Sequence, residues 1–208
     1  MTVKLYVGSK RYSSWSLRPY LALAHAGVPF DTEVILLDQA DTKANIAKVT
    51  PSARVPVLHD GDLVIWDSLA ICEYVAELEP ELWPAERGAR ARARSISAEM
   101  HSSFAALRRD MPMDLCSTKP GTGHTAEALA DARRVMEIWR EALAKSSGPF
   151  LFGAFSIADA MFAPVTTRFT TYGVELDATC RAYVDAVQAT PAFRAWKHDA
   201  DAEPATRA

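Results

Sequence analysis

Residues 3–18 read VKLYVGSKRYSSWSLR, and this stretch predicts a short strand that passes directly into a helix. Its first part, residues 3–7, alternates around β-branched and aromatic side chains, and Gly8 is a natural end for such a strand. Its second part opens with Ser13 and Ser14, whose hydroxyls can accept hydrogen bonds from the unpaired N–H groups of a new helix. The same N–H groups and the helix dipole attract anions. The turn could therefore bind a sulfur nucleophile supplied by another molecule and lower its pKa.

The composition is that of a globular chain with no overall attraction to polyanions. Its 208 residues are 49% hydrophobic and 24% charged, enough for one large domain or two small ones. The net charge of −3 predicts no nucleic-acid partner, and no apolar run approaches the roughly 20 residues of a membrane span. We expect no signal peptide. Three separated cysteines indicate a reducing, cytoplasmic compartment and lack the spacing of a metal site.

Strand and helix patterns alternate in the first part of the chain. A strand at residues 3–7, a helix at 16–26 and a strand at 32–36 predict a βαβ unit with a parallel pair. The turn Asp60-Gly61 between two apolar runs predicts a hairpin. Directly after it, Asp67-Ser68 is a good N-terminal cap for another helix.

The composition changes at residues 80–84, PELWP, which we interpret as part of a linker. Beyond it the strand signals fade, and helices are expected at residues 87–110, 125–144, 157–172, 178–189 and 191–202. We therefore predict an α/β domain at residues 1–79, a linker at 80–86 and an all-helical domain at 87–208.

Four motifs follow one another in a characteristic order. They are the serine-rich turn at 13–18, RVPVL at 54–58, DSLAI at 67–71 and SIAD at 156–159. In this order they resemble the motifs of the soluble glutathione transferases over nearly the whole chain. The turn is most similar to the Ser-Ser-Cys-x-x-Arg motif of the zeta class, which includes maleylacetoacetate isomerases, but Trp15 replaces the cysteine. The resemblance implies a thioredoxin-like domain followed by a helical domain.

The resemblance also implies a site for reduced glutathione in the first domain. Ser13, with Ser14 as second choice, would donate a hydrogen bond to the thiolate, whereas the residues alone also allow two simple helix caps. The Val55–Pro56 peptide bond would be cis, so that Val55 pairs with the cysteinyl part of glutathione. The Asp67-Ser68 pair would hold the γ-glutamyl group. The expected glutathione-binding residues are Trp15, Arg18, Lys43, Arg54, Val55, Pro56, Asp67 and Ser68.

The electrophile site is expected over the helical domain. His101, Phe104 and Arg108 are spaced by three and four residues, so on one helix they would share a face. That face either lines the electrophile pocket or simply packs Phe104 into the core, with His101 and Arg108 exposed to solvent beside it. Arg168 and Tyr172, four residues apart on a later helix, are further candidates. The motif at 156–159 is interpreted as a capping box that supports folding.

These observations together predict a glutathione transferase. The enzyme would ionise the thiol of reduced glutathione, its co-substrate, for attack on an electrophilic small molecule, with no metal. Two alternatives stay open. One is a glutathione-dependent cis–trans isomerase of the maleylacetoacetate type, whose diacid substrate would require a cationic pocket. The other is a non-catalytic binding protein of this fold. The resemblance further implies a homodimer.

Overall fold

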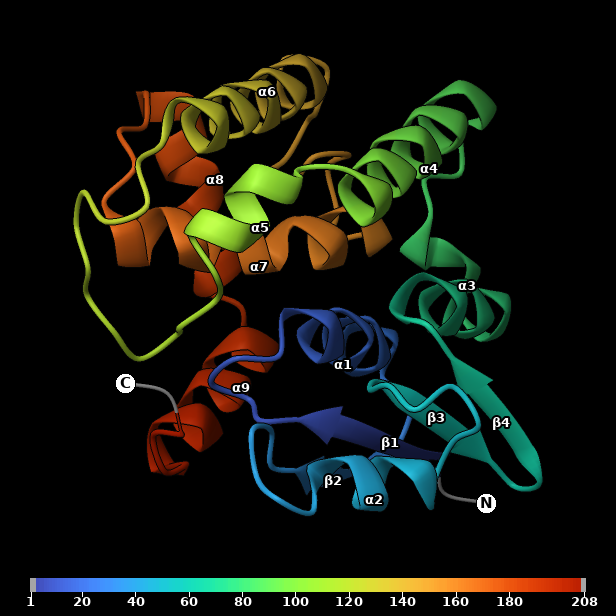
Figure 1. The fold of residues 1–208 in the computed structure, drawn as a ribbon. Coiled ribbons are helices and arrows are strands. Elements are labelled where there is room, and N and C mark those ends of the chain that lie inside the picture. Colours follow the sequence, from blue (N-terminus) through green and yellow to red (C-terminus); the bar gives the residue numbers. More distant parts are fainter. Residues whose placement is uncertain (1–2, 207–208) are drawn as a thin grey trace.

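The first half of the chain folds as a small mixed sheet with helices packed against it (Figure 1). The computed structural model describes residues 3–206. The elements of this half are β1 Val3–Gly8, α1 Ser14–Ala26, β2 Phe30–Ile35, α2 Thr42–Ala47, β3 Val57–Asp60, β4 Leu63–Trp66 and α3 Ser68–Leu78. The strand order is β2-β1-β3-β4, in which β1 runs parallel to β2 and β3 runs antiparallel to both of its neighbours.

The second half is built from helices and follows a 3-10 turn, η1, at Pro80–Leu82. Its helices are α4 Arg87–Ser102, α5 Ala105–Asp110, α6 Ala126–Leu143, α7 Ile157–Tyr172, α8 Ala178–Gln188 and α9 Pro191–Ala202. Figure 1 shows α4 to α8 above the sheet, while α9 returns beside α1. The prediction of an α/β part followed by an all-helical part is confirmed. Among the residues that the structure describes, no helix combines the length and apolarity needed to cross a membrane.

Helix α1 connects the two halves, and its sequence explains its position. Ser13 caps its start, and Gly27 ends it with a φ of 66°, a left-handed conformation that glycine adopts at little cost. Leu17 and Leu21, one turn apart, are fully buried. Because α1 packs against α3 on one side and against α7 and α9 on the other, its first turn lies close to the junction of the halves.

The predicted single helix at residues 87–110 is wrong, because the chain breaks it between Ser102 and Ala105. Phe104 has a φ of 65° and its side chain is 5% exposed, so the break buries the ring. Asp131 of α6 then accepts a hydrogen bond from the Leu107 N–H, at 3.0 Å, near the start of the new helix. Since neither glycine nor proline marks this break, local sequence gave no sign of it. His101 and Arg108 consequently lie on different helices.

Helix α7 lies at the centre of the helical half, and its first turn is fixed by Asp159. The Asp159 carboxylate is fully buried and accepts hydrogen bonds from Leu151 N at 3.0 Å, Ser156 N at 2.8 Å and Tyr183 OH at 3.1 Å. The Ser156 hydroxyl donates to it as well, at 2.8 Å, within a capping box. Burial raises the pKa of Asp159 to about 6. This carboxyl therefore joins the start of α7 to the preceding loop and to α8.

Candidate functional site

The turn between β1 and α1 carries the serines that the sequence singles out. The Ser13 Oγ accepts a hydrogen bond from Ser16 N at 3.4 Å and donates to the Ser16 Oγ at 2.7 Å. The Ser16 Oγ also accepts from Gly8 N at 3.0 Å, so the turn is tied to the end of β1. The Ser14 side chain makes no hydrogen bond within residues 3–206. Both candidate serines are 6% exposed.

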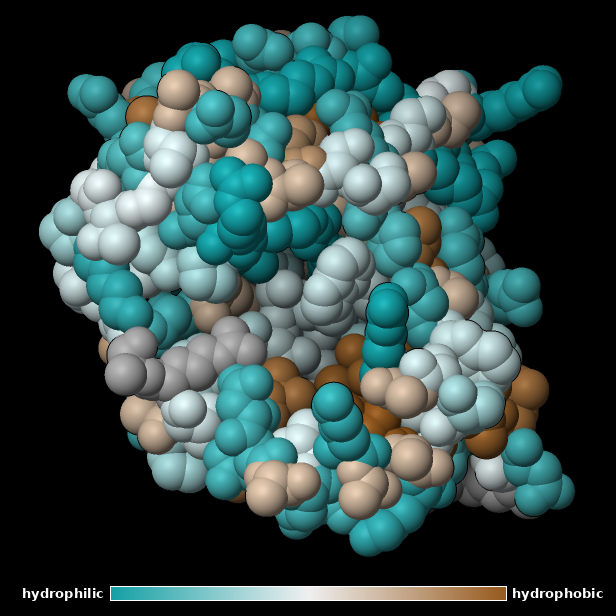
Figure 2. Space-filling view, viewed as in Figure 1, coloured by the Kyte–Doolittle hydropathy of each residue, from teal (hydrophilic) through white to brown (hydrophobic). Residues whose placement is uncertain are grey.

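A cavity of about 540 Å³ lies between this turn and the start of α3. Its wall includes the Val55–Pro56 peptide bond, which is cis, as the resemblance implies. In the described part of the chain the backbone of Val55 makes no hydrogen bond, so an extended peptide could pair with it. Figure 2 shows a hollow at the junction of the two halves, where α1 faces the helices above it. The cavity is lined by Trp15, Ser52, Arg54, Val55, Pro56, Trp66, Asp67, Ser68 and His101.

Asp67 and Ser68 form the part of the wall at the start of α3. The Asp67 Oδ1 caps the helix by accepting from Leu69 N at 2.8 Å and Ala70 N at 3.4 Å. Asp67 itself has a φ of 74°, which is unusual for a residue with a side chain. The Ser68 Oγ is buried and has no hydrogen-bond partner in residues 3–206. This wall therefore offers a second carboxylate oxygen, a free hydroxyl and a helix N-terminus to a ligand.

His101, near the end of α4, contributes a side chain of the helical half to the same wall of the cavity. Its Nε2 lies 3.4 Å from the Asp67 Oδ2, and its ring meets the Trp15 ring edge-on at a centroid distance of 5.3 Å. Burial lowers the pKa of His101; the Asp67 carboxylate opposes this lowering, and the charges of Arg18 and Arg108 add to it. We therefore expect a neutral imidazole at pH 7.

Two arginines, Arg18 and Arg108, lie against the Trp15 ring, and a third, Arg168, is close enough for its charge to act on both of them. The Arg18 guanidinium is 0% exposed and none of its nitrogens has a hydrogen-bond partner among the described residues. The guanidinium carbons of Arg18 and Arg108 lie 4.4 and 4.8 Å from the centre of the Trp15 ring. Burial, followed by the charges of Arg108 and Arg168, lowers the pKa of Arg18 to about 9. The cluster is still cationic at pH 7, and it favours a nearby negative charge.

The cavity brings together seven of the residues that the sequence predicts for the site: Trp15, Arg54, Val55, Pro56, Asp67, Ser68 and His101. Ser13, Ser14 and Arg18 do not line the cavity; they are buried next to Trp15, in the turn and first helical turns that carry it. Lys43 is exposed on α2 and does not line the cavity.

The remaining electrophile-site candidates are engaged in packing and in backbone contacts. Phe104 is buried in the core, and Arg108 donates to the carbonyls of Met100 and Ser103. Arg168 donates to Met111 O at 2.6 Å, and the Tyr172 hydroxyl donates to Pro112 O at 2.9 Å. None of these four residues lines the cavity.

Two cavity residues were missed by the sequence reasoning. Trp66 closes β4 next to Asp67 and is 47% exposed, and Ser52 lies in the loop before Arg54. Trp66 could have been found from the sequence, because it is an aromatic residue directly before the Asp67-Ser68 pair. Nothing in the sequence marks Ser52.

A second cavity, of about 500 Å³ between the start of α4 and the end of α6, contains none of the predicted site residues. In residues 3–206 no three His, Cys, Asp or Glu side chains are grouped to hold a metal ion.

Comparison with known proteins gives consistent matches over both halves. The family described as "Glutathione S-transferase, N-terminal domain" matches residues 12–78, and "Glutathione S-transferase, C-terminal domain" matches residues 122–196. "Glutathione S-transferase 1" of Zea mays is 32% identical over 178 residues, which cover 79% of this chain and 82% of that protein. "Probable maleylacetoacetate isomerase" of Caenorhabditis elegans is 28% identical over 178 residues, covering 83% of this chain and 81% of that protein.

Solved structures show the same fold. A glutathione transferase homolog from Burkholderia, crystallised with bound glutathione, superposes with a TM-score of 0.75 at 22% sequence identity. The superposition covers 98% of this chain and all of the other, 100%. At 22% sequence identity, this similarity shows that the two proteins share a fold.

Proposed function

Because the chain belongs to the glutathione transferase family, we propose that it binds reduced glutathione in the cavity beside Trp15 and ionises its thiol for attack on an electrophile. The observation that carries the proposal is the meeting of three distant segments around one cavity. They are the first turn of α1 at Trp15, the cis Val55–Pro56 bond and the Asp67-Ser68 helix start. The cavity volume, about 540 Å³, lies within the usual range for small-ligand sites.

The ends of glutathione have matching partners in this cavity. The unpaired backbone of Val55 suits the cysteinyl unit, which would pair with it as an added strand does. The start of α3 and the free Ser68 hydroxyl suit the γ-glutamyl carboxylate. The Asp67 Oδ2 suits the α-ammonium group, and His101 would orient that carboxylate. Arg54, which lines the cavity, suits the glycyl carboxylate better than Lys43, which does not line it.

The thiol would meet the hydroxyl of Ser13. Hydroxyl hydrogens rotate, so the hydrogen that Ser13 now gives to Ser16 can turn to a thiolate. Ser14, whose hydroxyl has no hydrogen-bond partner among the described residues, is the second candidate. The uncompensated charge of Arg18 lies one helical turn away and favours the ionised sulfur. In the reaction a sulfur–carbon bond forms and the electrophile's leaving group departs with the electron pair of its own bond.

Thiol ionisation and conjugation together test the function. Glutathione bound to the protein should show thiolate absorbance at lower pH than free glutathione, with the thiol pKa lowered by about one unit or more from its usual ~8.5–9. A chlorinated nitroaromatic should then yield the glutathione conjugate and chloride. S-methylglutathione, which has no ionisable thiol, is the control for absorbance changes of the protein. Tight glutathione binding with an unshifted thiol pKa, and no conjugate across a panel of electrophiles, would instead support a non-catalytic binding protein.

The arginine cluster favours a second candidate, the isomerase. Arg18 and Arg108 lie against the Trp15 ring, and the charge of Arg168 acts on both, so the three positive charges form one cluster that would attract an electrophile with carboxylates. In this reaction the thiolate adds to a conjugated double bond, the new single bond rotates, and elimination restores both the double bond and the thiolate. No net oxidation or reduction takes place.

Replacement of Arg108 tests whether this cluster recognises carboxylates. If it does, Arg108→Met should lower kcat/KM for maleylacetone about tenfold more than for a neutral chlorinated nitroaromatic, because one of the positive charges that attract the carboxylates is lost. Turnover of both substrates by the two proteins provides the comparison. An equal loss for both would show that Arg108 serves the fold through its contacts with Met100 and Ser103.

The family relationship also supports a homodimer in the cytoplasm as part of the proposal. Leu63 and Trp66 of β4 and Leu78 of α3 are apolar and about half exposed, at 50%, 47% and 51%. Such side chains, on neighbouring elements, suit a surface that a second subunit covers.

A further inference from the structure

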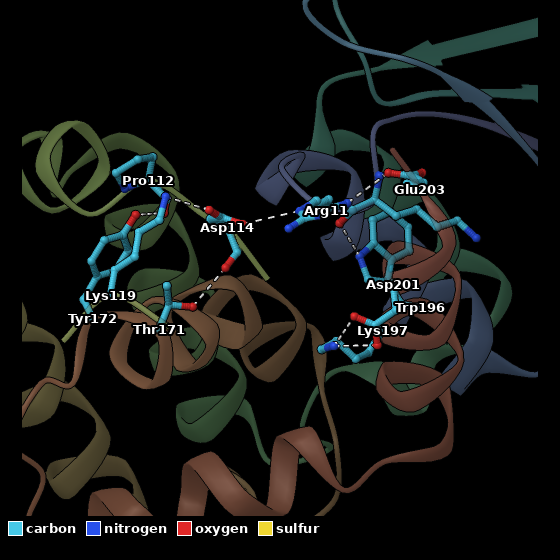
Figure 3. Close-up of polar contacts among 11 residues, drawn as sticks. Arg11, Pro112, Asp114, Lys119, Thr171, Tyr172, Trp196, Lys197, Asp201 and Glu203 are labelled. Carbon is cyan, nitrogen blue, oxygen red and sulfur yellow. Dashed lines mark hydrogen bonds and ion pairs between the residues drawn. The ribbon is translucent and has the colours of Figure 1, made fainter. Parts of the chain in front are cut away.

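The end of helix α9 holds the loop that leads into the catalytic turn (Figure 3). The two carboxylate oxygens of Glu203 accept hydrogen bonds from the backbone N–H groups of Lys10, at 2.9 Å, and Arg11, at 3.2 Å. The Trp196 Nε1 donates to the Lys10 carbonyl at 2.9 Å. About 190 residues of chain separate these partners, so the contacts exist only in the folded protein.

The Lys10 side chain strengthens the same junction. It is 6% exposed, forms an ion pair with Asp199 of α9, and lies 5.5 and 5.3 Å from the rings of Tyr20 and Trp196. The Trp196 ring is fully buried. Trp196 and Lys10 therefore anchor α9 against α1, whereas Glu203, just beyond the helix end and half-buried, contributes mainly its two hydrogen bonds.

A second segment of the helical half holds the other side of the loop. The Leu115 N–H donates to the Arg11 carbonyl at 3.1 Å, and Arg11 lies 3.6 Å from the Asp114 carboxylate. Figure 3 shows Asp114 between Arg11 and Lys119, with which it forms an ion pair at 2.9 Å. Thr171 of α7 donates to the Asp114 carbonyl at 3.0 Å. The loop before the serines is thus fixed from both sides.

This loop is coupled directly to Ser13. The N–H groups of Tyr12 and Ser13 both donate to the Ser9 carbonyl, at 3.0 and 2.8 Å, so residues 9–13 form one compact turn. A displacement of Lys10 or Arg11 therefore moves the Ser13 hydroxyl. Hydrogen-bond donation to a thiolate is sensitive to such displacements, since a misplacement of about 1 Å can reduce a rate about 100-fold.

We propose that Glu203 is a positioning residue for thiol activation, which it supports by holding the backbone of Lys10 and Arg11. The inference rests on the proposed function of Ser13. Glu203 does not line the glutathione cavity, so it acts through the loop and not on the ligand.

The variants Glu203→Ala and Glu203→Gln test the proposal in the full-length protein. Glu203→Ala should lower kcat for conjugation about tenfold and raise the pKa of the bound thiol by about half a unit or more, with KM for glutathione changed less than about threefold. Glu203→Gln keeps one acceptor oxygen and should recover part of kcat. Glu175→Ala is the matched control, because Glu175 is exposed and makes no hydrogen bond or ion pair within residues 3–206, and it should match the wild type.

Amide hydrogen exchange separates this proposal from the proposed function. Exchange at Lys10, Arg11 and Ser13 should be faster in Glu203→Ala than in the wild type or Glu175→Ala. Unchanged exchange would show that Glu203 does not hold the loop and would overturn the inference. Faster exchange with unchanged kcat and thiol pKa would also overturn it. If Ser13→Ala retained full turnover, the proposed role of Ser13 in thiol activation would be refuted. The exchange measurement would still report whether Glu203 holds the backbone of Lys10 and Arg11.

Discussion

Ser13→Ala should lower kcat/KM for glutathione conjugation about 100-fold, a typical loss when one preorganised hydrogen-bond donor to a developing charge is removed. The dissociation constant of glutathione should change little, because Val55, Asp67 and Ser68 supply the proposed binding contacts. The pKa of the bound thiol should rise toward that of free glutathione. Stopped-flow turnover and titration of the thiolate absorbance measure the two effects separately.

A loss of activity in Ser13→Ala could also come from loss of the helix cap. The variant Ser13→Gly tests this competing explanation. Glycine is a tolerable N-cap, so this variant should keep stability within about 0.5 kcal/mol while losing the hydroxyl. It should be as inactive as Ser13→Ala. Ser14→Ala is the parallel test of the second serine. Full turnover in Ser13→Ala with a large loss in Ser14→Ala would move the thiol contact to Ser14, and full turnover in both would refute hydroxyl activation.

Asp159→Ala should destabilise the protein by about 3–5 kcal/mol, because it leaves several buried donors without an acceptor. Two of these donors, Leu151 N and Ser156 N, are backbone groups that cannot turn away. Equilibrium denaturation by urea measures the change. Asp177→Ala is the matched control, since Asp177 caps α8 at an exposed site and should cost about 1 kcal/mol. Equal losses in the two variants would contradict a special role for the buried network.

The pH dependence of this loss has a defined sign. Because burial raises the pKa of Asp159 to about 6, the folded state binds this proton more tightly than the unfolded chain, in which the pKa is about 3.9. The stability that this carboxyl contributes is therefore fully present below about pH 4 and falls as the pH rises toward 6. The difference between the wild type and Asp159→Ala should be larger at about pH 4.5 than at about pH 7.5. If Asp159→Ala does not fold, Asp159→Asn provides the comparison with a smaller loss.

Features that depend on neighbouring residues were predictable. The strand before Ser13, the Asp60-Gly61 hairpin and the helix starts at Asp67 and Ser156 each follow from residue types a few positions apart. The helix break at Phe104 was not predictable from local sequence, which has a continuous helical pattern there. Burial of the Phe104 ring and the hydrogen bond that Asp131 accepts from Leu107 N outweigh this local preference. As a result the expected shared face of His101 and Arg108 does not exist.

The local elements, their order and the chemically active residues in the serine turn and around Val55 and Asp67 could be derived from residue types and their spacing. Which of these residues meet depends on the packing of the whole chain. The approach of His101 to Asp67, the contact of Arg108 with the Trp15 ring and the attachment of Glu203 to Lys10 all join segments far apart in the chain. Spacing along a sequence fixes side chains within one helix or turn, but the placement of one element against another follows from how all the buried faces pack together.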